Sequence, residues 1–328
     1  MKETGRNERN HVAVFVMCSL LLLAVVSFVA LNFGTIKDVL VGMGYQPSSE
    51  MESIRESLDL TTKGRLIFNA VRPELQEKEE FNNRCREVEN ENAILGCYTD
   101  DKVYIYNITE SELEGIRELT AAHELLHAVY HRMPAEDKQK LSVILMEVYA
   151  ENQDVLGEEI GIYPEDQRLE ELYVREGTEI ADLPDSLEKH YAEIFKNQDV
   201  VAGYYNGYIT VFREIEKKLE ELLAKAKSIE AEITNKTTEY EKEAASLNKE
   251  VGEFNECAKT PDCFSSNYVF NNRRNELLSK QNALSSMYNA INNLISDYNT
   301  VVAEYNENVL HGQALNITIN SSTKVEGL

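Results

Sequence analysis

Apolar side chains in the last third of the chain recur at alternating steps of four and three residues. The pattern runs from Ile215 to Ile233, resumes from Tyr240 to Phe254, and returns from Leu277 to Tyr305. Sustained spacing of this kind specifies helices that wind around each other as a left-handed coiled coil. We therefore expect two arms of about 40 residues, each about 60 Å long, packed antiparallel as a hairpin over residues 206–311.

Two cysteines flank the point where the chain must reverse between these arms. Cys257 and Cys263 enclose Pro261, which cannot continue a helix interior. Cys85 and Cys97 form a second pair that is close in the sequence. The even number favours two local disulfides in an oxidising compartment, and four unrelated buried thiols are the alternative. Neither pair has the Cys-x-x-Cys spacing of a structural zinc site.

The charge balance of the chain is strongly acidic. With 57 acidic and 33 basic side chains, the formal net charge is −24. A surface of this sign repels the phosphate backbone of nucleic acids. No nucleic-acid partner is therefore expected, and the charge says little about any other substrate.

An apolar segment near the N-terminus predicts a membrane anchor. The 20 residues Val12–Leu31 carry no charge, and this length of helix crosses a hydrocarbon core of about 30 Å. A cleaved signal peptide is the competing interpretation, but its apolar region is typically only about 7–15 residues long. Lys2, Arg6 and Arg9 precede the segment and favour a cytoplasmic N-terminus. We therefore expect a single-pass protein whose chain beyond about Asn32 is extracytoplasmic.

A His-Glu-x-x-His motif lies in the middle of the chain, in a context of Ala and Leu that favours a helix. His123 and His127 are four residues apart, about one helical turn, and so project from the same helix face. Two neutral imidazoles on adjacent turns can bind one Zn²⁺ at about 2.0–2.1 Å each. Glu124 is rotated by about 100° from His123, which suits a general base acting on a metal-activated water. A chance match, with both histidines in a satisfied core, is the alternative.

The sequence just upstream of the motif predicts β-structure. The runs Ala93–Tyr98 and Val103–Ile108 are rich in β-branched and aromatic residues. Asp100 and Asp101 lie between the runs and predict a hairpin turn. Two strands followed by a motif-bearing helix are therefore expected.

Strands, a helix with His-Glu-x-x-His and a distal acidic helix together resemble the zincin superfamily of zinc metallopeptidases, over about residues 60–205. The sequence after His127 lacks the Gly-x-x-His extension of the metzincins, so the resemblance is to the gluzincin branch. It implies a glutamate as the third zinc ligand, on a helix several tens of residues beyond the motif. It also implies an edge strand along which an extended peptide substrate lies beside the metal.

Four glutamates in the acidic segment Leu169–Ile180 are candidates for that third ligand. Leu172 and Tyr173 are apolar anchors that allow a neighbouring carboxylate to point inward, so Glu171 is preferred. The candidates left open beside it are Glu170, Glu176 and Glu179. Gluzincins often have an acidic residue four positions after the ligand, where this chain has Arg175.

Metallopeptidases commonly use a His or Tyr side chain to stabilise the oxyanion. The candidates for this role are Tyr163, His190 and Tyr191, and the alternative for each is a packing role. His131 is four residues after His127 but about 6 Å further along the helix axis, which favours a supporting or surface role.

These patterns together predict an α+β chain that is mostly helical. The expected parts are a cytoplasmic tail (1–11), a transmembrane anchor (12–33), a stalk rich in Gly, Pro and Ser (34–50), a zincin-like metallopeptidase domain (51–205), the coiled-coil hairpin (206–311) and a flexible tail (312–328). The expected function is zinc-dependent hydrolysis of peptide or protein substrates outside the cytoplasm. The alternative is a catalytically inert, membrane-tethered scaffold or adhesin whose hairpin binds a protein partner or a second copy of the chain.

Overall fold

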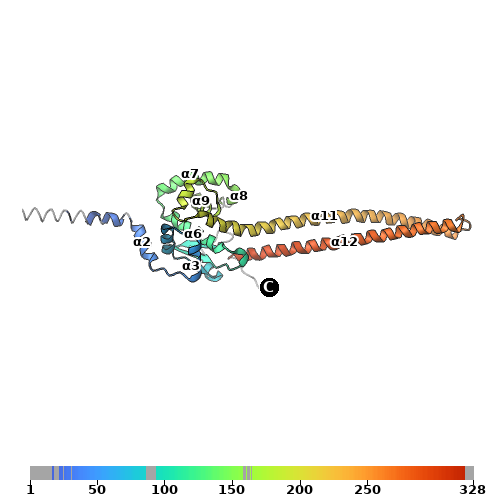
Figure 1. Cartoon of the computed structure of the whole chain (residues 1–328), viewed down its shortest axis with the longest axis horizontal. Coiled ribbons are helices and arrows are strands. Elements are labelled where there is room, and N and C mark those ends of the chain that lie inside the picture. The colour runs from blue at the N-terminus through green and yellow to red at the C-terminus, as the bar shows by residue number, and fades with distance from the viewer. Residues whose placement is uncertain are drawn as a thin grey trace, which may run out of the picture. The chain divides into compact units, whose positions relative to one another are not determined.

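The computed structural model describes residues 17, 22–24, 26–30, 32–85, 94–157, 160, 163 and 165–321. The chain is mostly helical with one small sheet, and it divides into two compact units, Met1–Val211 with Asn316–Leu328, and Phe212–Leu315. The described elements, labelled in Figure 1 where there is room, are α2 (Phe33–Gly42), α3 (Ser49–Ser57), α4 (Thr62–Val71), β1 (Glu74–Gln76), α5 (Lys78–Arg84), β2 (Gly96–Thr99), β3 (Lys102–Tyr106), the short 3₁₀ helix η2 (Ser111–Leu113), α6 (Ile116–Arg132), α7 (Ala135–Glu151), α8 (Gln153–Leu156), α9 (Glu165–Glu179), α10 (Asp185–Tyr191), α11 (Gln198–Lys259) and α12 (Asn267–Ile319).

A three-stranded sheet in the order β1-β3-β2 belongs to the first unit. β1 is parallel to β3, whereas β2 is antiparallel to it, with Cys97 opposite Tyr104. Asp100 and Asp101 form the turn between β2 and β3, both at positive φ (52° and 56°), as the twist of a two-residue hairpin turn requires. The predicted hairpin is therefore confirmed.

The predicted disulfide between Cys85 and Cys97 is present, with 5.8 Å between the two Cα atoms. Cys85 follows α5 directly, and Cys97 lies inside β2. Phe81 and Tyr104 complete a small buried cluster around the two cysteines. The crosslink and this cluster hold strand β2 to α5.

Helix α6 lies at the centre of the core of the first unit. Gly115 precedes it at a φ of 92°, and a Cβ there would come within 2.9 Å of the Tyr204 ring, so both conformation and space favour glycine. Ala122, Leu126 and Ala128 are fully buried in a cluster with side chains of α3, α4, α9 and α10. The small residues of the helix thus permit close packing on several sides.

The segment expected to be a stalk is largely structured. Helix α2 packs against α4, where a Cβ on Gly42 would stand 3.1 Å from Cβ of Asn69. Ser48 caps helix α3 by accepting a hydrogen bond from the backbone N–H of Met51. The Gly and Ser content that suggested a stalk over 34–50 instead serves a close helix contact and a helix cap.

No single helix among the described residues is long and apolar enough to cross a membrane. The helical segments Leu22–Ala30 and Phe33–Gly42 meet that requirement only together, and they are bent by 70° at the break between them. The predicted cytoplasmic tail and parts of the predicted anchor lie outside the described residues. The anchor therefore stays a prediction.

The second unit is formed by the two long helices that the sequence predicts. Within it, Lys218 pairs with Glu304, and Glu250 pairs with Arg273 and Lys280. Because the partner's number falls as the position along α11 rises, α11 and α12 run antiparallel and side by side (Figure 1). The buried apolar side chains of this unit are Leu222, Leu247, Leu277, Ile291, Val301 and Leu315. The first four are positions of the predicted pattern. The pattern also includes Val302, but the structure buries Val301 in its place.

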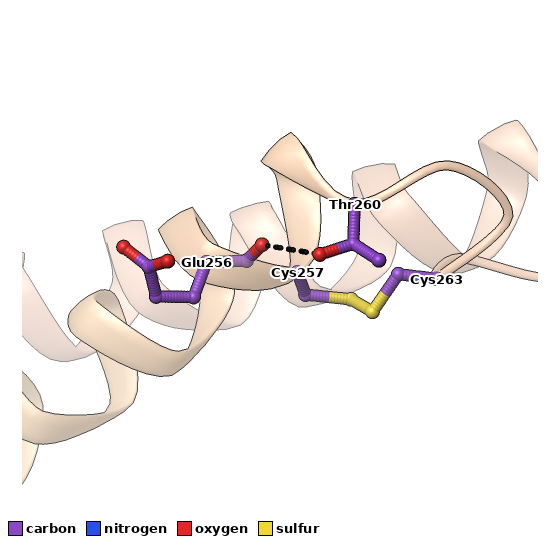
Figure 2. Close-up of a disulfide and its surroundings, with 4 residues drawn as sticks. All are labelled: Glu256, Cys257, Thr260 and Cys263. Atoms are coloured by element: carbon purple, nitrogen blue, oxygen red, sulfur yellow. Dashed lines mark hydrogen bonds between the residues drawn. A yellow bond between two sulfur atoms is a disulfide. The ribbon is translucent and has the colours of Figure 1, made fainter.

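The second predicted disulfide closes the turn between these helices. Cys257 lies in the last turn of α11, and its Cα is 5.4 Å from that of Cys263 (Figure 2). The hydroxyl of Thr260 donates a hydrogen bond to the carbonyl of Glu256 at 3.1 Å. Asp262 takes a positive φ of 64°, and this left-handed residue helps the chain turn out of α11.

Helix α12 extends into the segment expected to be a flexible tail and ends at Ile319. Beyond it, the carbonyl of Asn320 accepts a hydrogen bond from Lys78, and that of Ser321 accepts one from Asn82 at 2.6 Å. Residues 312–319 are therefore helical rather than a flexible tail, and residues 320 and 321 bond to α5, which is remote in the sequence. Residues 322–328 lie outside the described part of the chain.

Candidate metal centre

Helix α6 presents the two histidines of the motif on one half-buried face. Nε2 of His123 and Nε2 of His127 lie 3.3 Å apart. Leu125 and Leu126, on the other faces of the helix, are completely buried. Since the apolar positions fix the rotation of α6 in the core, the imidazoles are directed toward α9, the helix that packs beside it.

Helix α9 supplies a buried carboxylate to this pair. Glu171 is 5% exposed, with Oε1 at 3.8 Å from Nε2 of His123 and Oε2 at 3.6 Å from Nε2 of His127. A tetrahedral zinc ion with ligands at about 2.0–2.1 Å has neighbouring ligand atoms about 3.3 Å apart. The separation of the two Nε2 atoms, 3.3 Å, matches this value. One oxygen of the Glu171 carboxylate is near each ring, and the ligand atoms of the three residues all lie within 4.8 Å of one another. Among the described residues this is the group able to hold a metal ion, and it unites the three predicted ligands.

A glycine sets the close approach of α9 to α6. A Cβ on Gly177 would come within 2.6 Å of Leu126 Cδ1 and 2.6 Å of the Tyr191 ring. The Tyr191 hydroxyl, fully buried, donates a hydrogen bond to the carbonyl of Tyr173 at 2.6 Å. These contacts fix the rotation of α9, and thereby select which of its glutamates faces the histidines.

Glu170 contacts His127 at the ring nitrogen that does not face Glu171. Its Oε1 accepts a hydrogen bond from Nδ1 of His127 at 2.8 Å and lies 3.0 Å from Nε2 of His131. A ligating histidine commonly donates its other ring nitrogen to a carboxylate, which fixes the orientation of the ring. Glu170, a candidate ligand on sequence grounds, therefore serves here as a positioning residue, with His131 as a supporting one.

The two remaining glutamate candidates lie elsewhere. Glu179 accepts two hydrogen bonds from the guanidinium of Arg175, at 2.8 and 3.0 Å. Glu176 is completely buried, and neither of its carboxylate oxygens has a hydrogen-bond partner among the described residues. Burial raises the pKa of Glu176 to about 9. Arg175 stands where gluzincins often have an acidic residue, and it bonds to Glu179 and to the carbonyl of Leu156.

The surroundings of His123 and His127 shift the pKa values of the two rings in opposite directions. Burial, with the neighbouring His127 and Arg175, holds the pKa of His123 well below its ordinary value. Burial also lowers the pKa of His127, but the hydrogen bond to Glu170 and the charges of Glu124 and Glu171 outweigh it and raise the pKa to about 9. A metal ion bound at Nε2 would take the place of the proton that these carboxylates favour.

Glu124 lies directly beneath strand β2. The carboxylate is buried, and a Cβ on Gly96 would come within 2.6 Å of both its Oε1 and Cγ2 of Thr120. Only glycine leaves room for the strand to cross the helix here. Sequence reasoning did not single out Gly96, although a lone glycine inside a strand pattern signals such a close backbone approach.

The predicted oxyanion donors are not part of the ligand group. Tyr163 precedes α9, where its carbonyl accepts a hydrogen bond from Arg168 at 2.9 Å. His190 lies 3.2 Å from the hydroxyl of Tyr173 and lines a cavity of about 380 Å³ between α4, α6, α7 and α10 that none of the three metal ligands lines. Tyr191 is buried in the core. The oxyanion role stays a prediction for Tyr163, His190 and Tyr191.

Comparison of the chain with protein-family models, curated proteins and solved structures gives no match. The case for a metal centre therefore depends on the geometry of these side chains.

Proposed function

We propose that this chain is a membrane-anchored, extracytoplasmic zinc endopeptidase. His123, His127 and Glu171 are its metal ligands, and the observation that carries the proposal is the convergence of their ligand atoms, which all lie within 4.8 Å of one another. Three protein ligands leave one coordination position for water or substrate, as in catalytic zinc sites.

Each residue of the site has its own role in the proposed hydrolysis. When bound, Zn²⁺ supplies a Lewis acid that polarises a peptide carbonyl and lowers the pKa of water to about 7. Glu124 takes a proton from the attacking water as the new C–O bond forms, and delivers it to the amine as the C–N bond breaks. Glu170 keeps His127 in the ring orientation that leaves Nε2 free for the metal.

An extended peptide segment is the substrate class that suits the site. β2 is an edge strand of the described sheet, and its Gly96 lies against Glu124. A peptide that pairs with this edge by strand addition would run past the general base. We therefore propose unfolded or extended segments of proteins as substrates.

The disulfides support the proposed compartment. Two disulfides, Cys85–Cys97 and Cys257–Cys263, are typical of proteins that fold outside the reducing cytoplasm. The uncharged segment Val12–Leu31 supports a single anchor with the metal centre on the extracytoplasmic side.

Metal content tests the centre itself. The purified chain is expected to contain about one equivalent of zinc by elemental analysis, and a chelator should lower its unfolding temperature. The variant His123→Ala should lose the metal, whereas Glu136→Gln, on the exposed surface of α7, should retain it. A parent chain that binds no zinc and is indifferent to chelator would instead support the inert scaffold.

Hydrolysis tests the proposed role of Glu124. The parent should cleave members of a broad peptide library, and Glu124→Gln should retain zinc but lose at least about 10²-fold in rate, as expected for loss of a general base. Glu136→Gln is again the matched control. Equal cleavage by Glu124→Gln and the parent would contradict the mechanism.

A further inference from the structure

Helix α2 has its apolar face turned away from its own domain. At 100° per residue, Phe33, Ile36, Leu40 and Met43 lie along one side of this helix and its C-cap. Phe33, Leu40 and Met43 are 66%, 67% and 80% exposed. A surface helix of a soluble domain normally shows the reverse arrangement, with its apolar stripe toward the core.

The opposite side of α2 is charged and faces the protein. Asp38 is only 8% exposed and accepts hydrogen bonds from Nε and Nη2 of Arg132, the last residue of α6, at 2.9 and 3.1 Å. Nη1 of Arg132 also donates to the Tyr98 hydroxyl at 3.0 Å, and Lys37 pairs with Asp101 at 2.6 Å. Polar bonds thus join α2 to the helix that carries both histidines and to the β2–β3 hairpin.

The chain directly before α2 indicates what covers its exposed face. In the predicted anchor the described residues Leu22, Leu23, Val26, Phe28 and Val29 are exposed as well. This helical segment and α2 are bent by 70° at the break between them. If the first segment runs along the bilayer normal, a bend of this size places α2 nearly in the plane of the membrane. A helix in that plane buries its apolar face by about 5–10 Å into the boundary between headgroups and acyl chains.

We propose that α2 is an interfacial helix, with Phe33, Leu40 and Met43 inserted at the surface of a lipid bilayer. The inference rests on the membrane anchor of the proposed function. The Asp38–Arg132 pair then holds the metal-bearing helix α6 in a set orientation at the membrane surface. With a net charge of −24, the chain binds lipid here through apolar burial rather than through attraction to anionic headgroups.

Site-specific fluorescence quenching tests the position of this face. The full chain, with Cys18→Ser to remove the thiol outside the disulfides, is reconstituted in phosphatidylcholine vesicles. A bimane label is placed at Leu40→Cys, and a matched label is placed at Glu136→Cys on exposed α7. Brominated lipids should quench the Leu40 label severalfold more than the Glu136 label, and aqueous iodide should show the reverse order.

Three results would overturn the proposal in distinguishable ways. Quenching of the Leu40 label by iodide alone, in chains that stay in the vesicles after an alkaline wash, would place the face in water while leaving the anchor intact. Efficient crosslinking between two Leu40→Cys chains at low protein-to-lipid ratio, without lipid quenching, would assign the face to a second copy. Release of the whole chain by the wash would remove the anchor and the interfacial helix together, although zinc binding and hydrolysis could still be measured.

Discussion

His127 donates a hydrogen bond from Nδ1 to Oε1 of Glu170 at 2.8 Å, so that only its Nε2 faces the metal ligands. Replacing Glu170 with Ala removes the acceptor that fixes this ring. We expect zinc affinity to fall about 10–100-fold, the usual effect of losing such a partner. Competition with a chromophoric chelator measures the change, and Glu136→Gln should bind zinc like the parent. Unchanged affinity in Glu170→Ala would show that the ring is held by packing alone.

Gly96 gives a test that separates the general base from the metal. In Gly96→Ala the new methyl group must displace Glu124 or strand β2, because its Cβ would lie 2.6 Å from the carboxylate. We expect zinc to be retained and kcat for peptide hydrolysis to fall about 10–100-fold, as for a catalytic group moved by about 1 Å. Kinetics with parallel metal analysis provide the measurement.

The control for that variant is Gly207→Ala. Gly207 lies in α11, and a Cβ there meets nothing within 4 Å, so alanine should leave the rate unchanged and slightly stabilise the helix. If Gly96→Ala hydrolyses peptides as fast as Gly207→Ala, the carboxylate under β2 is not the general base.

The buried Glu176 should make the stability of the folded chain depend on pH. Its pKa is about 9 in the folded chain against 4.5 as the ordinary value, so between these values the folded state holds a proton that the unfolded state releases. The contribution of Glu176 to stability is therefore fully present below about pH 4.5 and is lost as pH rises toward about 9.

The variant Glu176→Gln cannot ionise and should lack this contribution. Relative to the parent, its free energy of unfolding should become larger on going from pH 6 to pH 9, because the parent loses stability over this range and the variant does not. Urea titrations at the two values, both with chelator present, measure the difference, and Glu136→Gln should follow the parent. A difference between Glu176→Gln and the parent that does not change with pH would contradict the buried neutral acid.

The disulfide at the tip of the hairpin should act locally. The double variant Cys257→Ser, Cys263→Ser opens a small ring, for which chain entropy accounts for about 2 kcal/mol. Phe254, Phe264 and Phe270, with ring centroids 5.1–5.3 Å apart, keep an apolar cluster at the tip. Hydrogen exchange should speed up around the turn, whereas zinc content and peptide hydrolysis stay at the parent level. Loss of zinc in this variant would contradict a purely local role.

Features set by local pattern were predictable from the sequence. The Asp100-Asp101 turn, both disulfides and the two long helices each depend on residues that are close along the chain or repeat regularly. His123 and His127 likewise owe their common face to a spacing of four within one helix.

Features set by long-range packing were harder to predict from the sequence. The neighbouring Leu172 and Tyr173 favoured Glu171 but left the other glutamates open, because the close approach of Gly177 to Leu126, which fixes the rotation of α9, cannot be read from the sequence. The docking of α2 through Asp38 and the bonds of Asn320 and Ser321 to α5 depend on partners remote in the sequence. Composition alone suggested a stalk and a flexible tail at these places.

The crosslink from Cys85 to Cys97 bears on when the proposed peptidase would become active. Cys97 directly follows Gly96, the residue whose backbone lies against Glu124. A newly made chain in a reducing compartment lacks this restraint on β2, so we expect the carboxylate of the proposed general base to be poorly positioned. Full hydrolytic power would then arise only after export and oxidation, and the cell that makes this protein would be spared its activity during synthesis.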